Sequence, residues 1–422
     1  MANEETHLNV KLNLHGARRV LTGHPWVRRK DLQHFKALPP AGTVVRLQDA
    51  GGDFLGHAFS DGATGELAYR VVSRERRPAL DASWFAERVE RALGLRRARL
   101  AREPLGACRL LNGENDGLPG IFCDKFGPFA VLDLLSPGAR AFLPWVEEAL
   151  RQQCRLEGLL RKVRFLSGDR QTRVSAKEAV ALEPAFGAVP ERRFAVGEGG
   201  LKFWIDLRQG AHEGLFLDQR ENRALVGSRA AGREVLNCFC YTGSFSAACL
   251  AGGAARTVNV DLSKGALAWA RDNLALNGFD PEAQEWHAAE AFEILGAWKK
   301  KGRRFGLVIQ DPPPFSRNKH GLFQAAKHYG RLAEDSLALV EDKGLAAFAC
   351  GAQDLARSTF YRYLAEAAQR AGKRCRLVSA GTRCQDFPVL EGFPEGDHQK
   401  FALIQVEGAG GRGELTGLEA CV

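Results

Sequence analysis

Apolar runs that stop abruptly at a Gly, an acid or a Pro dominate the second half of the chain. Such runs are typical of strands buried on both faces of a parallel sheet. They alternate with helical patterns such as 266–277, whose apolar residues share one face and which Ser263 can cap. The predicted strands are 235–239, 257–260, 306–310, 345–350 and 401–406. This βαβ rhythm predicts an α/β domain with a Rossmann-like sheet, which binds ligands at the carboxyl ends of its strands.

Shorter patterns fill the first half. Two alternating runs flank a turn at 49–53 and predict a β-hairpin over 42–59. These short strands, with the segment 24–27 before them, resemble a small β-barrel of the PUA type, which is a compact RNA-binding fold. Helical spacing from about Leu80, followed by predicted strands at 121–123 and 130–135, indicates an α+β region.

We therefore expect four parts along the chain. They are a PUA-like domain at 1–75, a middle α+β domain at 76–200, a Rossmann-like domain at 201–408 and a Gly-rich flexible tail at 409–422. The Gly-rich stretch 197–200 is the expected hinge into the Rossmann-like domain.

Composition places the chain among soluble globular proteins. Its 422 residues are 45% hydrophobic and 26% charged, which suits two or three domains. No apolar run approaches the roughly 20 residues of a membrane helix, and the start lacks a signal-peptide pattern. We expect a cytoplasmic protein without a membrane partner. The ten cysteines lack Cys-x-x-Cys and zinc-ligand spacings, which predicts free thiols and no metal.

Positive charge is the one unusual bulk property. The net charge is +9, and basic residues gather at 28–30, 96–102, 161–164 and 299–304. Any single cluster is best explained as a solvated face. Four clusters on a basic chain favour a polyanionic partner such as a nucleic acid.

A cofactor site is predicted after the strand 235–239. The chain must turn sharply into a helix, and Gly243 allows a positive φ and a close approach of backbone to ligand. Asp261 follows roughly 18 residues later, near the position where a doubly wound fold places the acid that binds a ribose. The pattern G-x-G-x-x-G is missing, which disfavours NAD and favours a phosphate-free ligand such as S-adenosylmethionine (SAM). Taken singly, each residue is equally well a loop Gly or a helix-start acid.

Further cofactor contacts are predicted around this turn. Phe239 and Tyr241 lie within it, and Glu290 could bind the adenine amino group, although a solvated Glu at a helix start is an open alternative. Gln219 ends a segment before the first strand, where it could contact the methionine part of SAM or the substrate.

Asp311 is predicted to serve both cofactor and substrate. It ends an apolar strand and precedes three Pro residues, which rigidify the turn and remove backbone donors. A loop of this kind suits a flipped base, on which Phe315 could stack. A Pro-rich loop can also be a simple stop signal, but an Asp at this position favours function.

Cys350 closes the strand 345–350, so its thiol is expected to open onto the same crevice. Carbon-5 of cytosine is a poor nucleophile, and addition of a thiolate to carbon-6 makes it enamine-like and able to accept a methyl group. Loss of the carbon-5 proton and expulsion of the thiolate complete the cycle, with Asp311 interacting at nitrogen-3. A structural Cys at a strand end remains an equal alternative.

Seven pieces of the chain carry a family resemblance: 24–27, 112–120, 216–220, 236–243, 260–261, 311–313 and 393–396. In order and spacing they resemble the bacterial PUA-containing large-subunit ribosomal RNA methyltransferases, which make 5-methylcytosine in 23S rRNA. The resemblance implies a PUA domain, a middle domain characteristic of that family and a Rossmann-like SAM domain. It also implies that Cys350 matches the nucleophilic Cys and that the partner is large-subunit ribosomal RNA.

Two departures from the family leave the target base open. Ala349 and Gly351 flank the Cys where the family has Ser, and Pro314 follows the Asp-Pro-Pro where the family has Lys or a similar residue. This loop is closer to related enzymes that methylate guanine at nitrogen-7 and lack the Cys. The alternatives are therefore methylation of another atom with a structural Cys350, or a non-catalytic RNA-binding or ribosome assembly factor. A monomer and a homodimer are both compatible with the sequence.

Overall fold

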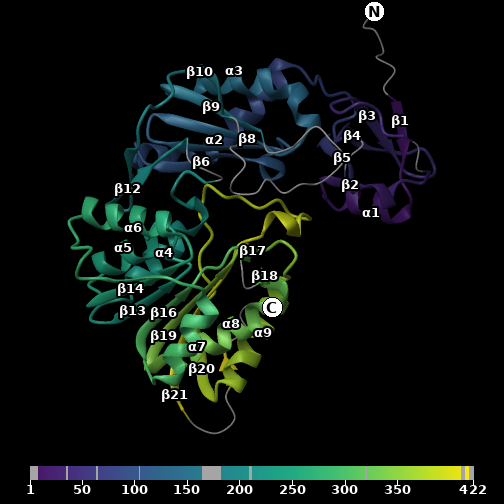
Figure 1. Ribbon diagram of the computed structural model, residues 1–422. Helices are drawn as coiled ribbons and strands as arrows, with labels where there is room; N and C mark the ends of the chain where they lie inside the picture. Colours follow the sequence, from purple (N-terminus) through teal and green to yellow (C-terminus); the bar gives the residue numbers. More distant parts are fainter. Residues whose placement is uncertain are drawn as a thin grey trace, which may run out of the picture. The chain divides into compact units, whose positions relative to one another are not determined.

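The computed structural model describes residues 8–34, 37–62, 65–103, 105–163, 182–208, 212–318, 321–409 and 414–417 (Figure 1). The chain folds into two compact units. The first comprises Met1–Gly197, Ile205–Glu213 and Gln385–Gly396, and the second comprises Glu198–Trp204, Gly214–Cys384 and Asp397–Val422. The chain thus leaves the second unit after Cys384 and returns to it at Asp397. The predicted domain boundaries at 75, 200 and 408 stay predictions.

The first sheet of the first unit contains the predicted hairpin. Its strands are β1 (Leu8–Lys11), β2 (Trp26–Arg28), β3 (Val44–Gln48), β4 (Phe54–Ser60) and β5 (Leu67–Ser73). They lie in the order β1-β3-β4-β5-β2, with helix α1 (Leu14–Leu21) following β1. The turn between β3 and β4 is closed by Asp49, whose Oδ1 accepts the N–H groups of Gly52 and Asp53 at 2.9 and 2.8 Å.

The second sheet of this unit lies in the region predicted as α+β. Its strands are β6 (Ala107–Asn112), β7 (Ile121–Phe126), β8 (Phe129–Leu134), β9 (Gly158–Val163) and β10 (Leu182–Gly187), in the order β10-β9-β8-β7-β6. Two helices share its core, α2 (Ala82–Arg102) and α3 (Leu143–Gln153). Asp81 caps α2 by accepting the N–H of Trp84 at 3.0 Å. The sequence predicted β7 and β8 but missed β9, because Arg161 and Lys162 interrupt its apolar pattern.

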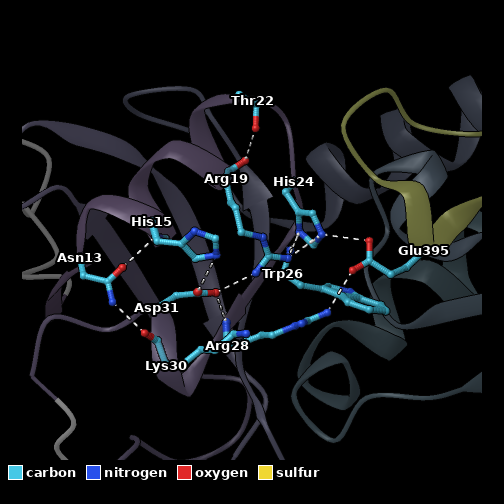
Figure 2. Close-up of polar contacts among 11 residues, drawn as sticks. Asn13, His15, Arg19, Thr22, His24, Trp26, Arg28, Lys30, Asp31 and Glu395 are labelled. Carbon is cyan, nitrogen blue, oxygen red and sulfur yellow. Dashed lines mark hydrogen bonds and ion pairs between the residues drawn. The ribbon is translucent and has the colours of Figure 1, made fainter. Parts of the chain in front are cut away.

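Three of the segments that carry the family resemblance meet in the first unit, and Figure 2 shows the contacts between two of them, 24–27 and 393–396. Trp26 Nε1 donates to Glu114 at 2.8 Å, and the Trp26 ring lies 4.8 Å from that of Phe393. Glu395 binds His24 Nε2 and Arg28 Nη2, both at 3.0 Å. The segments 24–27, 112–120 and 393–396 therefore build one polar and aromatic cluster.

The second unit contains the Rossmann-like sheet. Its strands are β13 (Glu234–Cys238), β14 (Arg256–Asp261), β15 (Glu285–Ala288), β16 (Phe305–Gln310), β19 (Val340–Cys350), β20 (Lys373–Ser379), β21 (Lys400–Ala409) and β22 (Glu414–Thr416). The order is β15-β14-β13-β16-β19-β21-β20-β22. The pairs from β15 to β19 are parallel, while β21 is antiparallel to β19. All five predicted strands are therefore confirmed.

Helices cover both faces of this sheet (Figure 1). They are α4 (Arg220–Gly227), α5 (Ser244–Ala251), α6 (Lys264–Leu276), α7 (Ala291–Lys300), α8 (Ala325–Leu337) and α9 (Arg357–Arg370). Side chains of β19 alternate between two cores: Phe348 and Cys350 pack with α7, α8 and α9, whereas Ala347 and Ala349 pack with α4 and α5. Ser263 caps α6 as predicted, accepting the N–H of Ala266 at 3.1 Å.

Short elements complete the chain. The hairpin-like pairs β11 (Phe194–Glu198) with β12 (Leu201–Ile205) and β17 (Phe315–Asn318) with β18 (Gly321–Gln324) form two-stranded sheets. The short 3-10 helices are η1 (Arg29–Asp31), η2 (Gly113–Asp116), η3 (Gly138–Phe142), η4 (Leu217–Gln219) and η5 (Pro394–Gly396).

The predicted flexible tail needs one correction. Residues 414–416 form β22, which pairs in parallel with β20. The edge of β20 offers unpaired backbone groups, and pairing with them orders these residues despite the Gly-rich sequence before them. The rest of the predicted tail at 410–413 and 418–422, like Arg164 of a predicted basic cluster, lies outside the described residues.

The described residues also test the predictions that were made from the cysteine spacing and the hydropathy. Each of their cysteines is a free thiol, and all but Cys154 are fully buried. In the same part of the chain, no group of three or more His, Cys, Asp or Glu side chains is arranged to hold a metal ion. None of the helices described there is long and apolar enough to cross a membrane.

Candidate active site

The strand order of the second unit defines where a ligand can bind. From β13 the sheet continues to β14 and β15 on one side and to β16 and β19 on the other. The connections therefore diverge at the carboxyl ends of β13 and β16, which is the switch point where open α/β sheets form a crevice. The predicted cofactor turn follows β13, and Asp311 follows β16.

The turn after β13 has an unusual backbone. Phe239 and Tyr241 have φ angles of 55° and 47°, in the left-handed region that non-Gly residues rarely adopt. Gly243 has a φ of 75° and is the N-cap residue of α5. A Cβ at Gly243 would lie 2.9 Å from the Cβ of Ala270 on α6, so glycine is also required for helix packing. The predicted positive φ is confirmed, and its role in ligand approach stays a prediction.

Asp261 fixes this turn to the end of β14. Its Oδ2 accepts the N–H of Tyr241 at 2.9 Å, and its Oδ1 accepts the N–H of Ser263 at 2.8 Å. Burial raises the pKa of Asp261, while the N–H groups of Ser263 and Tyr241 oppose that rise. Each carboxylate oxygen can accept a second hydrogen bond, so Asp261 retains the capacity to bind two ribose hydroxyls.

A chain of amides positions Asp311. Gln219 Nε2 donates to Asp311 Oδ1 at 3.1 Å, and Asn222 Nδ2 donates to Gln219 Oε1 at 2.7 Å. The structure thus brings together two predicted residues that are far apart in sequence. Asn222 was missed because a polar residue inside a helix gives no signal of its own.

The pKa of the Asp311 carboxyl group lies close to neutral pH. Burial raises its pKa to about 7, and the negative charge of Asp218 adds to the rise. Arg223 and the hydrogen bond from Gln219 oppose it. The Arg223 guanidinium is already bound to Glu198 at 2.6 Å, which limits its effect. At neutral pH Asp311 can therefore both accept and donate a proton.

Cys350 ends β19, the strand beside β16, but its side chain is not where the sequence suggested. The thiol was expected to open onto the crevice, yet its exposed fraction is 0% and it packs in the apolar core with α8 and α9. The reason is the alternation of β19, which directs Cys350 to the same side as Phe348. The expected exposure is wrong, and the catalytic role of Cys350 stays a prediction.

The surroundings of the thiol contain two residues that the sequence analysis missed. Burial raises the pKa of Cys350 to about 11, while a backbone hydrogen bond from Ala352 and the positive charge of Lys400 oppose the rise. Lys400 lies opposite Cys350 in the register of β21 and donates to the Ala352 carbonyl at 2.8 Å. The sequence feature that could have revealed Lys400 is its position at the start of an apolar strand, where a charged residue is unusual.

Tyr329 connects the two predicted catalytic residues. Its hydroxyl donates to the carbonyl of Ala349 at 2.7 Å, and its pKa is raised well above the ordinary value by burial and by the charges of Cys350 and Asp311. Both residues are therefore close enough to Tyr329 to act on it electrostatically. The sequence analysis missed Tyr329 because an aromatic residue within a helical pattern predicts only a position in the hydrophobic core.

Glu290 caps α7. Its Oε2 accepts the N–H of Glu293 at 3.0 Å, directly after the strand β15 at the same edge of the sheet. This is the helix-start position that the sequence analysis left open, and binding of an adenine amino group by Glu290 stays a prediction.

Comparison with known proteins decides the family. Residues 170–391 match the model of the S-adenosylmethionine-dependent methyltransferases, and residues 10–74 match the PUA-like domain. The chain belongs to the S-adenosylmethionine-dependent methyltransferase family. Its PUA-like domain contains the first sheet, as the resemblance implied.

Relatives extend this similarity over nearly the whole methyltransferase. The "Ribosomal RNA large subunit methyltransferase I" of Shewanella amazonensis is 32% identical over 390 residues, covering 91% of this chain and 95% of the relative. That of Tolumonas auensis is 32% identical, covering 92% and 96%. The crystal structure of SMU.776 complexed with SAH has a TM-score of 0.84 at 23% identity and covers 94% of this chain and all of that one. The last similarity concerns the fold.

The residues present fit the SAM that this methyltransferase uses. At the switch point the carboxyl groups of Asp261 and Asp311 lie at the ends of β14 and β16, beside a turn with positive φ angles. Carboxylates suit ribose hydroxyls, an amino group and a sulfonium charge, and no phosphate has to be held. When bound there, SAM supplies an electrophilic methyl group.

Proposed function

We propose that this methyltransferase acts in the cytoplasm on large-subunit ribosomal RNA and forms 5-methylcytosine. The names of relatives that match over 91% and 92% of this chain support the RNA substrate. The PUA-like domain at 10–74 and the net charge of +9 are in keeping with it. The observation that carries the choice of base is the placement of Cys350 and Asp311 at the carboxyl ends of neighbouring parallel strands.

In this proposal Cys350 is the nucleophile. Its thiol gives up its proton to water and the sulfur adds to carbon-6 of the flipped cytosine. Carbon-5 takes the methyl group, which leaves S-adenosylhomocysteine, and then loses its own proton to water as the sulfur is expelled as thiolate. The ammonium of Lys400 and the N–H of Ala352 stabilise the thiolate, and both already lower the pKa of the buried thiol. Because burial holds that pKa at about 11, the thiolate forms only once the substrate is bound.

Asp311 is the proposed proton donor near neutral pH. With a pKa of about 7 its carboxyl is partly protonated at neutrality, so it can donate to ring nitrogen-3 as negative charge develops on the cytosine. The amide of Gln219 holds it in place at 3.1 Å. Gly243, Asp261 and Glu290, together with the turn residues Phe239 and Tyr241, would hold SAM.

One observation favours a second candidate. The complete burial of Cys350 and its high pKa are also what a structural cysteine shows. In that case the enzyme methylates another atom of ribosomal RNA, such as nitrogen-7 of guanine, which needs no covalent adduct.

A mechanism-based substrate separates the two candidates. We expect RNA carrying 5-fluorocytosine at the target to form a covalent adduct with the enzyme, because the fluorine cannot leave as a proton does. The adduct should be lost in Cys350→Ala and kept in Cys375→Ala, a control that removes another fully buried thiol from the same core. Adduct formation is read by denaturing electrophoresis.

Nucleoside mass spectrometry completes the test. Ribosomal RNA from a deletion strain should lack one 5-methylcytosine. Methylation that persists in Cys350→Ala, or the loss of 7-methylguanine in place of 5-methylcytosine, would reject the cytosine proposal. Unchanged ribosomal RNA would support a non-catalytic assembly factor.

A further inference from the structure

Many basic residues of the clusters seen in the sequence form ion pairs within the fold. Their cations bind nearby carboxylates rather than remain available for a partner. The pairs are Arg28–Glu395, Arg96–Asp116, Arg99–Glu103, Arg161–Glu147, Lys162–Glu213 and Arg303–Glu285. The net positive charge must therefore be presented by other residues, and their positions indicate where a polyanion can bind.

A groove of about 1010 Å³ lies on the helical side of the second sheet of the first unit. One wall is a stripe of α2 at helical spacing, and the other is the end of α3 and the residues after it. The lining residues are Glu90, Leu93, Arg97, Leu100, Ala101, Leu110, Lys125, Gln153, Cys154 and Arg155. The groove thus combines an apolar floor with polar walls.

The charge of this groove is positive. Arg97 and Arg155 are exposed on opposite walls, and neither forms an ion pair within the described part of the chain. Lys125 lies on the same face of β7 as the core residue Cys123, and burial lowers its pKa. Against these three cations stands one acid, Glu90. The excess of positive over negative side chains favours an anionic ligand in the groove.

We propose that this groove binds a single-stranded segment of the RNA substrate outside the methylated nucleotide. Its phosphates contact Arg97 and Arg155, and one base covers Leu93 and Leu100. An unstacked base has an apolar face for this floor, whereas the bases of a duplex are covered by their neighbours. The volume of about 1010 Å³ and the presence of a cation on each of two walls suit a nucleotide with its flanking phosphates. The inference rests on the proposed function for the identity of the RNA.

The test uses the full chain with both arginines neutralised, Arg97→Gln with Arg155→Gln. Binding of a fluorescent oligouridylate is measured by anisotropy at several salt concentrations. We expect the Kd to rise about tenfold, and the slope of log K against log salt to shrink by about 1.4, since each single-strand phosphate contact contributes about 0.7. The KM for RNA should rise in parallel while kcat is unchanged, because the groove contains no catalytic residue.

Arg102→Gln is the matched control, since Arg102 is also exposed on α2 but does not line the groove. It should bind like the wild type. If Arg155 serves only to balance the negative carboxyl end of α3, its substitution will lower Tm and leave the Kd unchanged. That result would overturn the groove proposal, as would a wild-type protein that does not bind the oligouridylate or that prefers a duplex.

Failure of the proposed function gives a different pattern. If the wild type methylates no ribosomal RNA but its binding to the oligouridylate still depends on Arg97 and Arg155, the groove stands and the proposed substrate is wrong. If ribosomal RNA is methylated and the double variant has the wild-type KM and Kd, the proposed function stands and the groove is wrong.

Discussion

Two buried carboxyl groups, one in each unit of the molecule, have different partners. In the first unit Asp116 receives two hydrogen bonds from the fully buried Arg96, at 2.8 and 2.7 Å. In the second, burial and then the negative charge of Asp218 raise the pKa of Asp311 to about 7, although Gln219 donates an amide hydrogen bond to its carboxylate. Asp116 is therefore paired with a cation inside the first unit, whereas Asp311, with an amide donor and a second acid beside it, can exchange a proton near neutrality.

Glu395 extends the contrast within the first unit (Figure 2). The hydrogen bond to His24 lowers its pKa to about 2, with a further contribution from the charge of Arg28. The first unit therefore uses carboxylates to hold its segments together, including the segment 385–396 that the chain inserts between two parts of the second unit. The second unit keeps one carboxyl group poised for chemistry.

The largest effect is expected from Arg96→Met. Arg96 has 0% exposure and also donates to the carbonyls of Ala92 and Asp386, at 2.8 and 2.9 Å. Its loss leaves the Asp116 carboxylate buried without its cation, which should cost about 3–5 kcal/mol of unfolding free energy. Urea denaturation followed by tryptophan fluorescence measures this.

The control for this change is Arg102→Met, an exposed position on the same helix, where we expect a change within about 0.5 kcal/mol. If the two variants lost equal stability, the buried pair would not be the element that holds α2 to its neighbours.

Asp311→Asn should reduce kcat about 100-fold or more while leaving the fold intact, since the amide cannot supply the proton. The wild-type pKa is raised, so the folded state binds a proton that the unfolded state has released, and this contribution to stability is lost as pH rises from about 4 to about 7. The variant should lack that decline. Single-turnover methylation and Tm measured across this pH range test both expectations.

The variant Asp218→Asn tests the role of Asp311 as a proton donor in a second way. Removing the neighbouring negative charge should lower the pKa of Asp311, so the alkaline limb of the profile of kcat against pH, which a proton donor sets, moves to lower pH. A profile that does not move in Asp218→Asn and an unchanged kcat in Asp311→Asn would together remove Asp311 from the catalytic step.

The sequence predicted the Rossmann-like sheet well because its strands are apolar runs with clear ends. It also placed Asp261 and Asp311 at one edge, since the topology of such a sheet requires it, and it predicted Gln219 only as a contact of SAM or the substrate. It could not predict that Arg96 binds Asp116 or that Arg161 binds Glu147, because a run of charges does not reveal partners brought by folding.

The same limit applies to the direction of side chains. Cys350 was correctly placed at the end of a strand, but the side to which its thiol points depends on the register with β21 and on the helices that cover that face. Asn222 and Tyr329 were missed because each is a common residue within a helix, and only the fold shows that they bind Gln219 and Ala349. Sequence patterns locate the edge of the site, whereas packing decides the orientation of its groups.

The smallest effect is expected from Glu395→Gln, which removes the charge but keeps an amide of the same shape. Its folded pKa of about 2 lies below the ordinary value, so its contribution to stability is present above about pH 4.5 and is lost as pH falls toward 2. Because the side chain is 22% exposed, solvent screening limits the loss at pH 7 to about 1–2 kcal/mol. The difference between wild type and variant should therefore shrink on acidification, as measured by urea unfolding at pH 7 and pH 3. The control is Glu391→Gln, a change at an exposed position of the same segment, and its stability relative to the wild type should not depend on pH in this way. If it did, the effect would belong to the segment as a whole rather than to the contacts of Glu395 with His24 and Arg28.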